Sequence, residues 1–123
     1  MNCGCPVQKV DSNLRKLTII RPKKIYGAMH TISIYIDDIE YGIFKNGDKK
    51  IFEIPNGNIC VQAKIHGQKF DKYAGIDMGK SDVYHIKEND KNIYLLLKLK
   101  LNGMIAITIL EKIDKENINS YLN

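Results

Sequence analysis

Three stretches of the chain alternate between apolar and polar residues, and this pattern constrains the fold more than any other feature. Residues 31–36 read TISIYI, residues 59–65 read ICVQAKI and residues 93–101 read IYLLLKLKL. A period of two places alternate side chains on one face, as in a strand with one buried face. A helix over 93–110 is excluded as an interpretation, because Asn102-Gly103 interrupts it.

Turn signals separate the alternating stretches at intervals of nine to ten residues, the spacing of a sandwich or barrel. They are Asp37-Asp38, Asn46-Gly47 and Pro55-Asn56-Gly57. We expect Asn46-Gly47 to close a tight hairpin with positive φ at both central positions. The predicted strands cover residues 14–20, 31–36, 40–45, 50–54, 58–65, 83–86, 93–101 and 104–110. Ile105, Ile107 and Ile109 are expected to point inward.

Together these patterns predict an all-β protein, a two-layer antiparallel β-sandwich of immunoglobulin-like or jelly-roll character with about eight strands. A chain of 123 residues fits one domain. We divide it into an irregular segment at 1–13, a sandwich at 14–113 and a tail at 114–123 that forms a short helix or coil. The glycine-rich loop 66–82 is a candidate partner-binding segment or a solvated crossover.

No stretch has the ~20 apolar residues that a membrane-spanning helix needs. The N-terminus lacks a basic segment followed by an apolar one, so we expect no secretory signal. Three cysteines are an odd number and too few for a disulfide framework. The cytoplasm is therefore the expected compartment.

The net charge of +5 is concentrated in residues 12–36, which contain no acidic residue. Such a patch binds polyanions, or it protects a strand edge against pairing. The candidate binding residues are Arg15, Arg21, Lys23, Lys24 and Tyr26. A basic groove with stacking aromatics would make an oligonucleotide-binding domain, which we keep as an alternative function.

Cysteines are the second alternative site. Cys3 and Cys5 are separated by one glycine and could hold a soft metal or form a reducible disulfide. A zinc site needs four ligands, and no second pair lies nearby in the sequence. Cys60 alternates with an apolar face, where a free thiol behaves as a small hydrophobe, so we expect a structural role.

The remaining polar residues form no catalytic pattern. His30, His66 and His85 match no metal-ligand spacing, and we expect them at the surface or half-buried. Asp37-Asp38 is interpreted as a turn, because adjacent side chains on a strand diverge. Loop 66–82 has neither the EF-hand order nor the glycine spacing of a phosphate-binding loop. We therefore expect no enzyme, no metal and no cofactor.

The middle of the chain resembles the PEGA-type and related small β-sandwich domains of bacteria over residues 14–65. The matching segments are IYIDDIEYG, KNGDKKIFEIPNG and ICVQAKI, and LTIIR followed by Gly27 is similar to their lead-in. The matching positions are Asp37, Gly42, Asn46, Gly47, Pro55 and Gly57. Asp38 stands where such domains usually have Gly, and Asn58-Ile59 stands where they often have a basic residue and His. The resemblance implies a sandwich without catalytic activity.

The sequence therefore predicts a non-catalytic interaction or structural module. Its expected partner is another protein or a second copy of the chain. Binding of nucleic acid through residues 15–24 and a thiol or metal site at Cys3 and Cys5 remain the alternatives.

Overall fold

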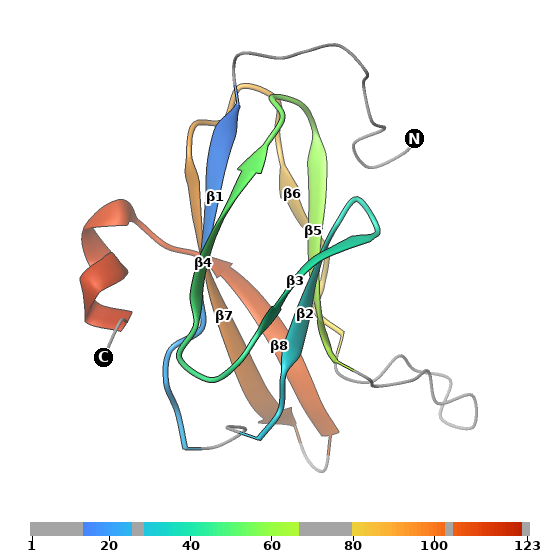
Figure 1. Ribbon diagram of the computed structural model, residues 1–123, viewed down its shortest axis with the longest axis vertical. Helices are drawn as coiled ribbons and strands as arrows, with labels where there is room; N and C mark the ends of the chain where they lie inside the picture. Colours follow the sequence, from blue (N-terminus) through green and yellow to red (C-terminus); the bar gives the residue numbers. More distant parts are fainter. Residues whose placement is uncertain (1–13, 26–28, 67–79, 103–104, 122–123) are drawn as a thin grey trace.

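The described residues of the computed structural model are 14–25, 29–66, 80–102 and 105–121, and they form a two-layer β-sandwich (Figure 1). Sheet A has the strand order β4-β1-β7-β8, and sheet B has the order β3-β2-β5-β6. The strands are β1 (Arg15–Ile20), β2 (Ile32–Ile36), β3 (Ile39–Phe44), β4 (Lys49–Ile54), β5 (Ile59–Ile65), β6 (Tyr84–Ile86), β7 (Ile93–Asn102) and β8 (Ile105–Lys112). The predicted all-β sandwich of eight strands is confirmed.

One strand pair differs from the antiparallel arrangement expected from the sequence. β1 lies in the interior of sheet A, antiparallel to β4 on one side and parallel to β7 on the other. The other pairs between strands are antiparallel. Strands that are far apart in the sequence therefore meet at the centre of sheet A.

The alternating residues build the core between the two sheets. Ile34, Val61 and Leu97 are fully buried, as are Leu17 and Phe44. Branched side chains suit this position, because they pack well on a pleated surface and lose little rotamer freedom there. Each fully buried Ile or Leu contributes about 1.5–3 kcal/mol through removal of apolar surface from water.

The inward face predicted for the last strand is wrong. In the observed register Leu97 pairs with Leu110 and Leu99 pairs with Thr108. Cross-strand partners share a face, so Leu110 and Thr108 point into the sandwich. The Thr108 hydroxyl is buried and donates to the Ala63 carbonyl oxygen at 3.1 Å. Ile107 and Ile109 lie on the other face, because the register with the leucines of β7 decides the orientation of β8.

The turn after β3 differs from the expected tight hairpin. Gly47 has a φ of 87°, whereas Asn46 is not among the residues with positive φ. The Asp48 N–H donates to the Lys45 carbonyl oxygen, and Asp48 Oδ2 accepts the Lys45 N–H. This turn does not join paired neighbours, since β3 belongs to sheet B and β4 to sheet A.

The C-terminal segment covers part of the outer face of sheet A. The 3₁₀-helix η1 (Lys115–Tyr121) follows β8 and lies beside sheet A (Figure 1). Ile118 and Tyr121 of η1 pack against a second apolar cluster, formed by Ile20, Leu96 and Ile113. The predicted tail is therefore a short helix with a packing role.

Candidate functional site

Arg15 is a structural residue at one end of the sandwich, although the sequence suggested it for binding. Its guanidinium donates to the carbonyl oxygens of Pro55 and Gly57 through Nη2 and of Lys87 and Asp90 through Nη1, at 2.7–2.9 Å. Only 6% of the residue is exposed. The four bonds tie β1 to the connections between β4 and β5 and between β6 and β7.

Arg21 occupies a similar position at the opposite end. Its Nη1 donates to the carbonyl oxygens of His30 and Phe44 at 2.7 and 2.9 Å, and 4% of the residue is exposed. Burial lowers the pKa of Arg21, and the nearby carboxylate of Asp48 opposes that shift. Both guanidinium groups therefore donate to backbone carbonyl oxygens that are distant in the sequence.

The other proposed basic residues lie nearer to solvent. Lys23 and Lys24 are exposed, and the Lys24 N–H donates to Asn46 Oδ1 at 2.9 Å. Tyr26 lies outside the described residues. Binding of anions by Lys23 and Lys24 stays a prediction.

A small cavity of about 120 Å³ opens beside Arg21. Its lining residues are Arg21, Pro22, Lys24, Asn46, Leu97, Lys98 and Leu99. Lys98 Nζ lies 2.8 Å from Glu111 Oε1, so its charge is already paired. Sites for drug-sized ligands usually have ~300–1,000 Å³, and this cavity is too small for a nucleotide.

His66 contacts a serine and a glutamate on the outer face of sheet B. Its Nδ1 lies 2.8 Å from Ser33 Oγ and 3.6 Å from Glu40 Oε2. In a catalytic triad the serine and the acid contact different ring nitrogens, whereas both contacts here involve Nδ1. Ser33 is only 1% exposed. The three residues therefore lack the geometry of a nucleophilic site.

Cys60 differs from the free, small hydrophobe that the sequence suggested, because it is disulfide-bonded. It lies opposite His85 on β6, with 3.4 Å between Cys60 Sγ and His85 Nδ1. Period-two patterning gives the face on which a cysteine lies but not its oxidation state, which explains the wrong expectation. Cys3 and Cys5, the other two cysteines of the chain, lie outside the described residues.

The histidines are dispersed. His30 precedes β2. His66 follows the last residue of β5, whereas His85 of β6 is opposite Cys60, near the first residue of β5. Six residues of extended strand separate positions 60 and 66, which is ~20 Å. Within the described ranges no group of three or more His, Cys, Asp or Glu side chains is placed to hold a metal ion.

Asp37 and Asp38 form the turn between β2 and β3, as the sequence predicted. Their φ values of 50° and 66° are those of a tight hairpin with positive φ at both central positions. Asp37 Oδ1 also accepts the Cys60 N–H at 3.0 Å. Burial raises the pKa of Asp37; the bond from Cys60 lowers it, and the charge of Asp38 raises it further.

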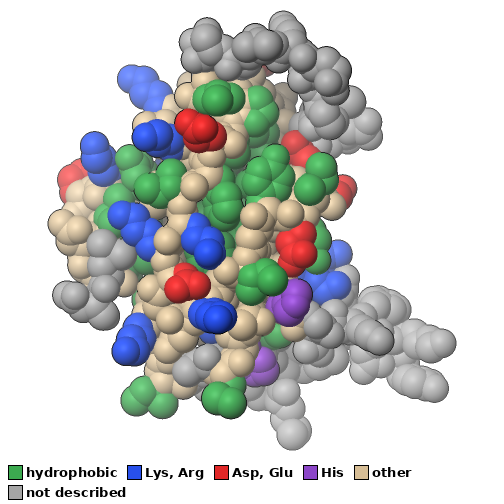
Figure 2. Space-filling view, viewed as in Figure 1, with side chains coloured by type: hydrophobic (Ala, Val, Ile, Leu, Met, Phe, Trp, Pro, Cys, Tyr) green, Lys and Arg blue, Asp and Glu red, His purple; other side chains and the backbone are tan. Residues whose placement is uncertain are grey.

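An apolar edge is the feature of the surface that sequence reasoning did not single out. β3 exposes Ile39 (56%), Tyr41 (45%) and Ile43 (38%), and the neighbouring β4 exposes Ile51 (55%). We call these four residues the β3–β4 edge. In Figure 2 hydrophobic side chains lie over β3 and β4 with charged side chains beside them. The signal was present in the segment IEYGIF, whose alternation was used only to predict a strand.

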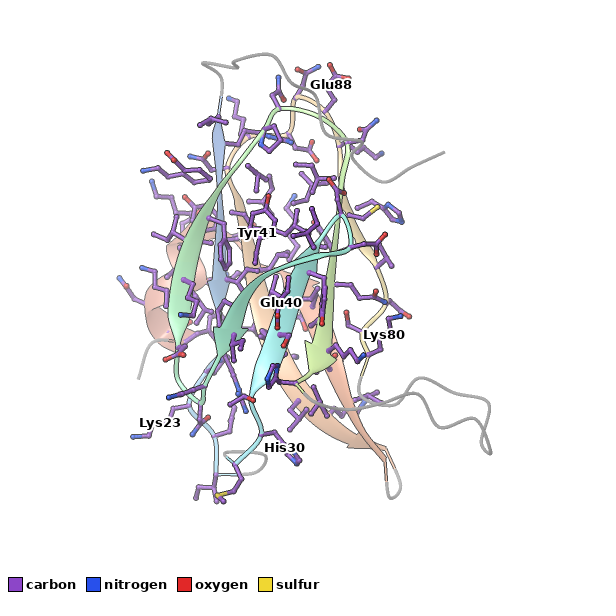
Figure 3. All side chains as sticks on the ribbon, turned by 45° about the vertical axis from the view of Figure 1, so that its right-hand side comes forward. Lys23, His30, Glu40, Tyr41, Lys80 and Glu88 are labelled. Carbon is purple, nitrogen blue, oxygen red and sulfur yellow. The ribbon has the colours of Figure 1, made fainter. Side chains whose placement is uncertain are left out.

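Tyr41 lies at the middle of the β3–β4 edge (Figure 3). Its ring meets the Phe52 ring edge-on, with 6.1 Å between centroids. Phe52 in turn packs against the core, 6.2 Å from the Phe44 ring. The aromatic rings therefore connect an exposed side chain to the interior and hold it in place.

Comparisons with known proteins give no relative: no protein-family model, curated protein or solved structure matches the chain. Among the described residues no helix is both long and apolar enough to span a membrane.

Proposed function

We propose that this protein is a non-catalytic binding module that recognises an acidic protein through the β3–β4 edge. The observation that carries the proposal is the exposure of Ile39, Tyr41 and Ile43 on one strand at the side of the sandwich. Large apolar side chains gathered at one surface are typical of interaction sites, and tyrosine is enriched among residues that dominate binding energy.

The position of Tyr41 supports binding by side chains in preference to the addition of a strand. Ile34 of β2 pairs with Gly42 of β3, and the next residue, Tyr35, pairs with Glu40. The register therefore shifts at this point, and Tyr41 is opposite no residue of β2. A bulge of this kind interrupts the hydrogen-bonding edge and protects it against strand addition. The partner would therefore meet the apolar side chains of β3.

The charge of the chain favours an acidic partner over a second copy. Lys45 and Lys49 flank the turn between β3 and β4 and are exposed. Two copies of a protein with net charge +5 repel each other during encounter, whereas an acidic surface is attracted.

A photo-crosslinking residue introduced at Tyr41 in the native cell tests the proposal. Val83 is the matched control, because it is 41% exposed and lies before β6 on the opposite edge of sheet B. We expect one acidic protein to be crosslinked at position 41 and not at position 83. The same protein, once purified, should bind Tyr41→Ala at least about tenfold more weakly than wild type and Val83→Ala equally well. The proposal would be overturned if Tyr41→Ala bound the crosslinked protein as tightly as wild type does, or if crosslinking were equal at positions 41 and 83.

A further inference from the structure

The small cavity beside Arg21 is surrounded by charges of one sign. The lining cations are Arg21, Lys24 and Lys98, and the other lining residues are Pro22, Asn46, Leu97 and Leu99. Lys23, the neighbour of two lining residues, marks the same end of the sandwich in Figure 3. Because cations around a recess attract anions, the cavity favours a negatively charged ligand.

The cavity exists because β1 ends before β7 does. The last pair between the two strands joins Ile20 and Leu96, although β7 continues beyond it. The Arg21 N–H donates to the Asp48 carbonyl oxygen at 2.8 Å, so Arg21 turns its backbone groups toward β4. Successive residues of a strand face opposite sides, and the next residue to face β7 is Pro22, which has no N–H to continue the ladder. Residues 22–24 therefore leave a gap beside residues 97–99.

The backbone of Leu99 turns its N–H toward this gap. The Tyr94 carbonyl oxygen accepts the Ile113 N–H at 2.9 Å, so Tyr94 faces β8. Because residues alternate along the strand, Leu97 and Leu99 face the opposite side, on which β1 has ended. Strand β1 supplies no acceptor there, since its pairs with β7 stop at Ile20. The Leu99 N–H is therefore placed to donate to a ligand in the cavity.

Two side chains add donors at the cavity. Lys24 is exposed, and among the described residues no carboxylate forms an ion pair with it. Asn46 Oδ1 accepts the Lys24 N–H at 2.9 Å, so Asn46 Nδ2 is the part of the amide left to donate. Lys98 Nζ is paired with Glu111 and contributes its methylene stem. The cavity thus combines a backbone N–H, an amide and an ammonium group.

Arg21 adds a fixed positive charge beside these donors. Its guanidinium donates to the carbonyl oxygens of His30 and Phe44, and the residue is buried. Asp48 is the carboxylate that acts on this charge; its Oδ2 accepts the Lys45 N–H, and it does not line the cavity. A charge removed from water acts more strongly on a neighbouring ion than a hydrated one does.

We propose that this cavity is a binding site for a small monocarboxylate. The Leu99 N–H, Asn46 Nδ2 and Lys24 Nζ donate to the carboxylate oxygens, and a short apolar tail lies against Pro22 and Leu97. The volume of about 120 Å³ suits about five heavy atoms, since a cavity of ~150 Å³ holds benzene. The apolar walls disfavour a dianion such as phosphate, whose burial requires more donors. The site is separate from the β3–β4 edge, because no residue of that edge lines the cavity.

Titration of the isotope-labelled wild-type chain with sodium propionate, followed by NMR, tests the site. We expect saturable shifts of the Lys24, Asn46 and Leu99 amide signals, with a dissociation constant on the order of 1 mM. Propionamide has the same size without the charge and should cause no such shifts, and sodium chloride controls for ionic strength. Equal shifts with propionamide would overturn the proposal.

A second titration identifies the source of the carboxylate. An acetylated alanine tripeptide with a free C-terminus is compared with the same peptide amidated at that end. Binding of propionate alone assigns the site to a free acid, and binding of the free-ended peptide but not the amidated one assigns it to the end of a chain. Both results support a carboxylate site. The proposal is wrong if neither propionate nor the free-ended peptide binds, or if both peptides bind equally well.

Variants locate the ligand within the cavity. Lys24→Met keeps the stem and removes the ammonium group, so the ligand that binds wild type should bind about fivefold more weakly. Lys23→Met is the matched control, because Lys23 is equally a surface lysine but does not line the cavity. Asn46→Asp keeps an oxygen for the Lys24 N–H and should abolish binding by repulsion between carboxylates. Wild-type affinity in both Lys24→Met and Asn46→Asp would exclude this site.

Discussion

Arg15 Nη2 lies 2.7 Å from the carbonyl oxygen of Gly57, so the first strand of the sandwich is bonded to the turn that leads into β5. The same guanidinium bonds three further carbonyl oxygens, those of Pro55, Lys87 and Asp90. A planar guanidinium suits this position, because its donors point in fixed directions and stay charged. The end of the sandwich near Glu88 in Figure 3 is therefore organised around one side chain.

Replacing Arg15 should destabilise the fold. Arg15→Met leaves four carbonyl oxygens without their donor, and we expect the free energy of unfolding to fall by about 3 kcal/mol in urea titrations. Lys16→Met is the control on the same strand, because Lys16 is exposed; its effect should stay within about 0.5 kcal/mol. Similar losses in both variants would contradict the structural role of Arg15.

The turn residue Asp38 should respond in opposite directions to two small substitutions. Its φ of 66° is accessible to glycine without steric cost, whereas a Cβ is disfavoured there. We expect Asp38→Gly to raise the free energy of unfolding by about 0.5 kcal/mol and Asp38→Ala to lower it by about 1 kcal/mol. Denaturant unfolding of both variants measures this, and a more stable Asp38→Ala would show that the backbone is not left-handed.

The raised pKa of Asp37 predicts a pH-dependent stability. A carboxyl group whose pKa is raised on folding prefers its protonated form, so ionisation disfavours the folded state above that pKa. Asp37→Asn keeps an oxygen for the Cys60 N–H and removes the charge. It should therefore be more stable than wild type at pH 7, by less than about 1 kcal/mol for this half-exposed group. The difference should disappear below the ordinary pKa of 3.8.

Unfolding curves of both proteins between pH 3 and pH 7 check the sign. If Asp37→Asn were less stable than wild type at pH 7, the stabilisation from the hydrogen bond between the Cys60 N–H and the charged carboxylate would exceed the free-energy cost of burying that charge.

The packing of η1 on sheet A can be tested with one buried charge. Ile118 is half-buried against the cluster of Ile20, Leu96 and Ile113. Ile118→Asp should destabilise the protein by about 2 kcal/mol, since it removes apolar burial and places a charge against the cluster. Asn119→Asp adds the same charge one residue further at an exposed position and should have little effect. Equal thermal shifts for the two variants would mean that η1 does not pack there.

The oligonucleotide alternative makes a separate prediction. The guanidinium groups that would contact phosphates most strongly, those of Arg15 and Arg21, donate to backbone carbonyls. We expect fluorescence anisotropy with single-stranded DNA to detect only weak binding at low salt, and none at physiological salt. Binding in the submicromolar range at physiological salt that is lost in Lys23→Glu/Lys24→Glu would restore this alternative.

The sequence was sufficient for the elements that depend on local patterns. Alternation gave the strands, and Asp37-Asp38 gave a turn because aspartate tolerates positive φ and bonds locally. The parallel neighbour of β1 and the inward face of β8 depend on which distant strands pair. The local sequence pattern does not indicate which strands will pair. The hydrogen bonds of Arg15 and Arg21 could not be predicted for the same reason, because their acceptors are carbonyl oxygens 9 to 75 positions away. The contact of Cys60 with His85 likewise exists only once β5 and β6 are paired.

The parallel pairing of β1 with β7 also has a consequence for how the chain folds during synthesis. Residues 17–20 lie next to residues 93–96, so the chain must be synthesised past residue 93 before β1 can have both neighbours. Until then one side of the nascent first strand has its backbone groups open to wrong partners. Contacts between such distant segments also slow folding. We therefore expect sheet A to form late in folding, because β1 can pair with β7 only after β7 has been synthesised.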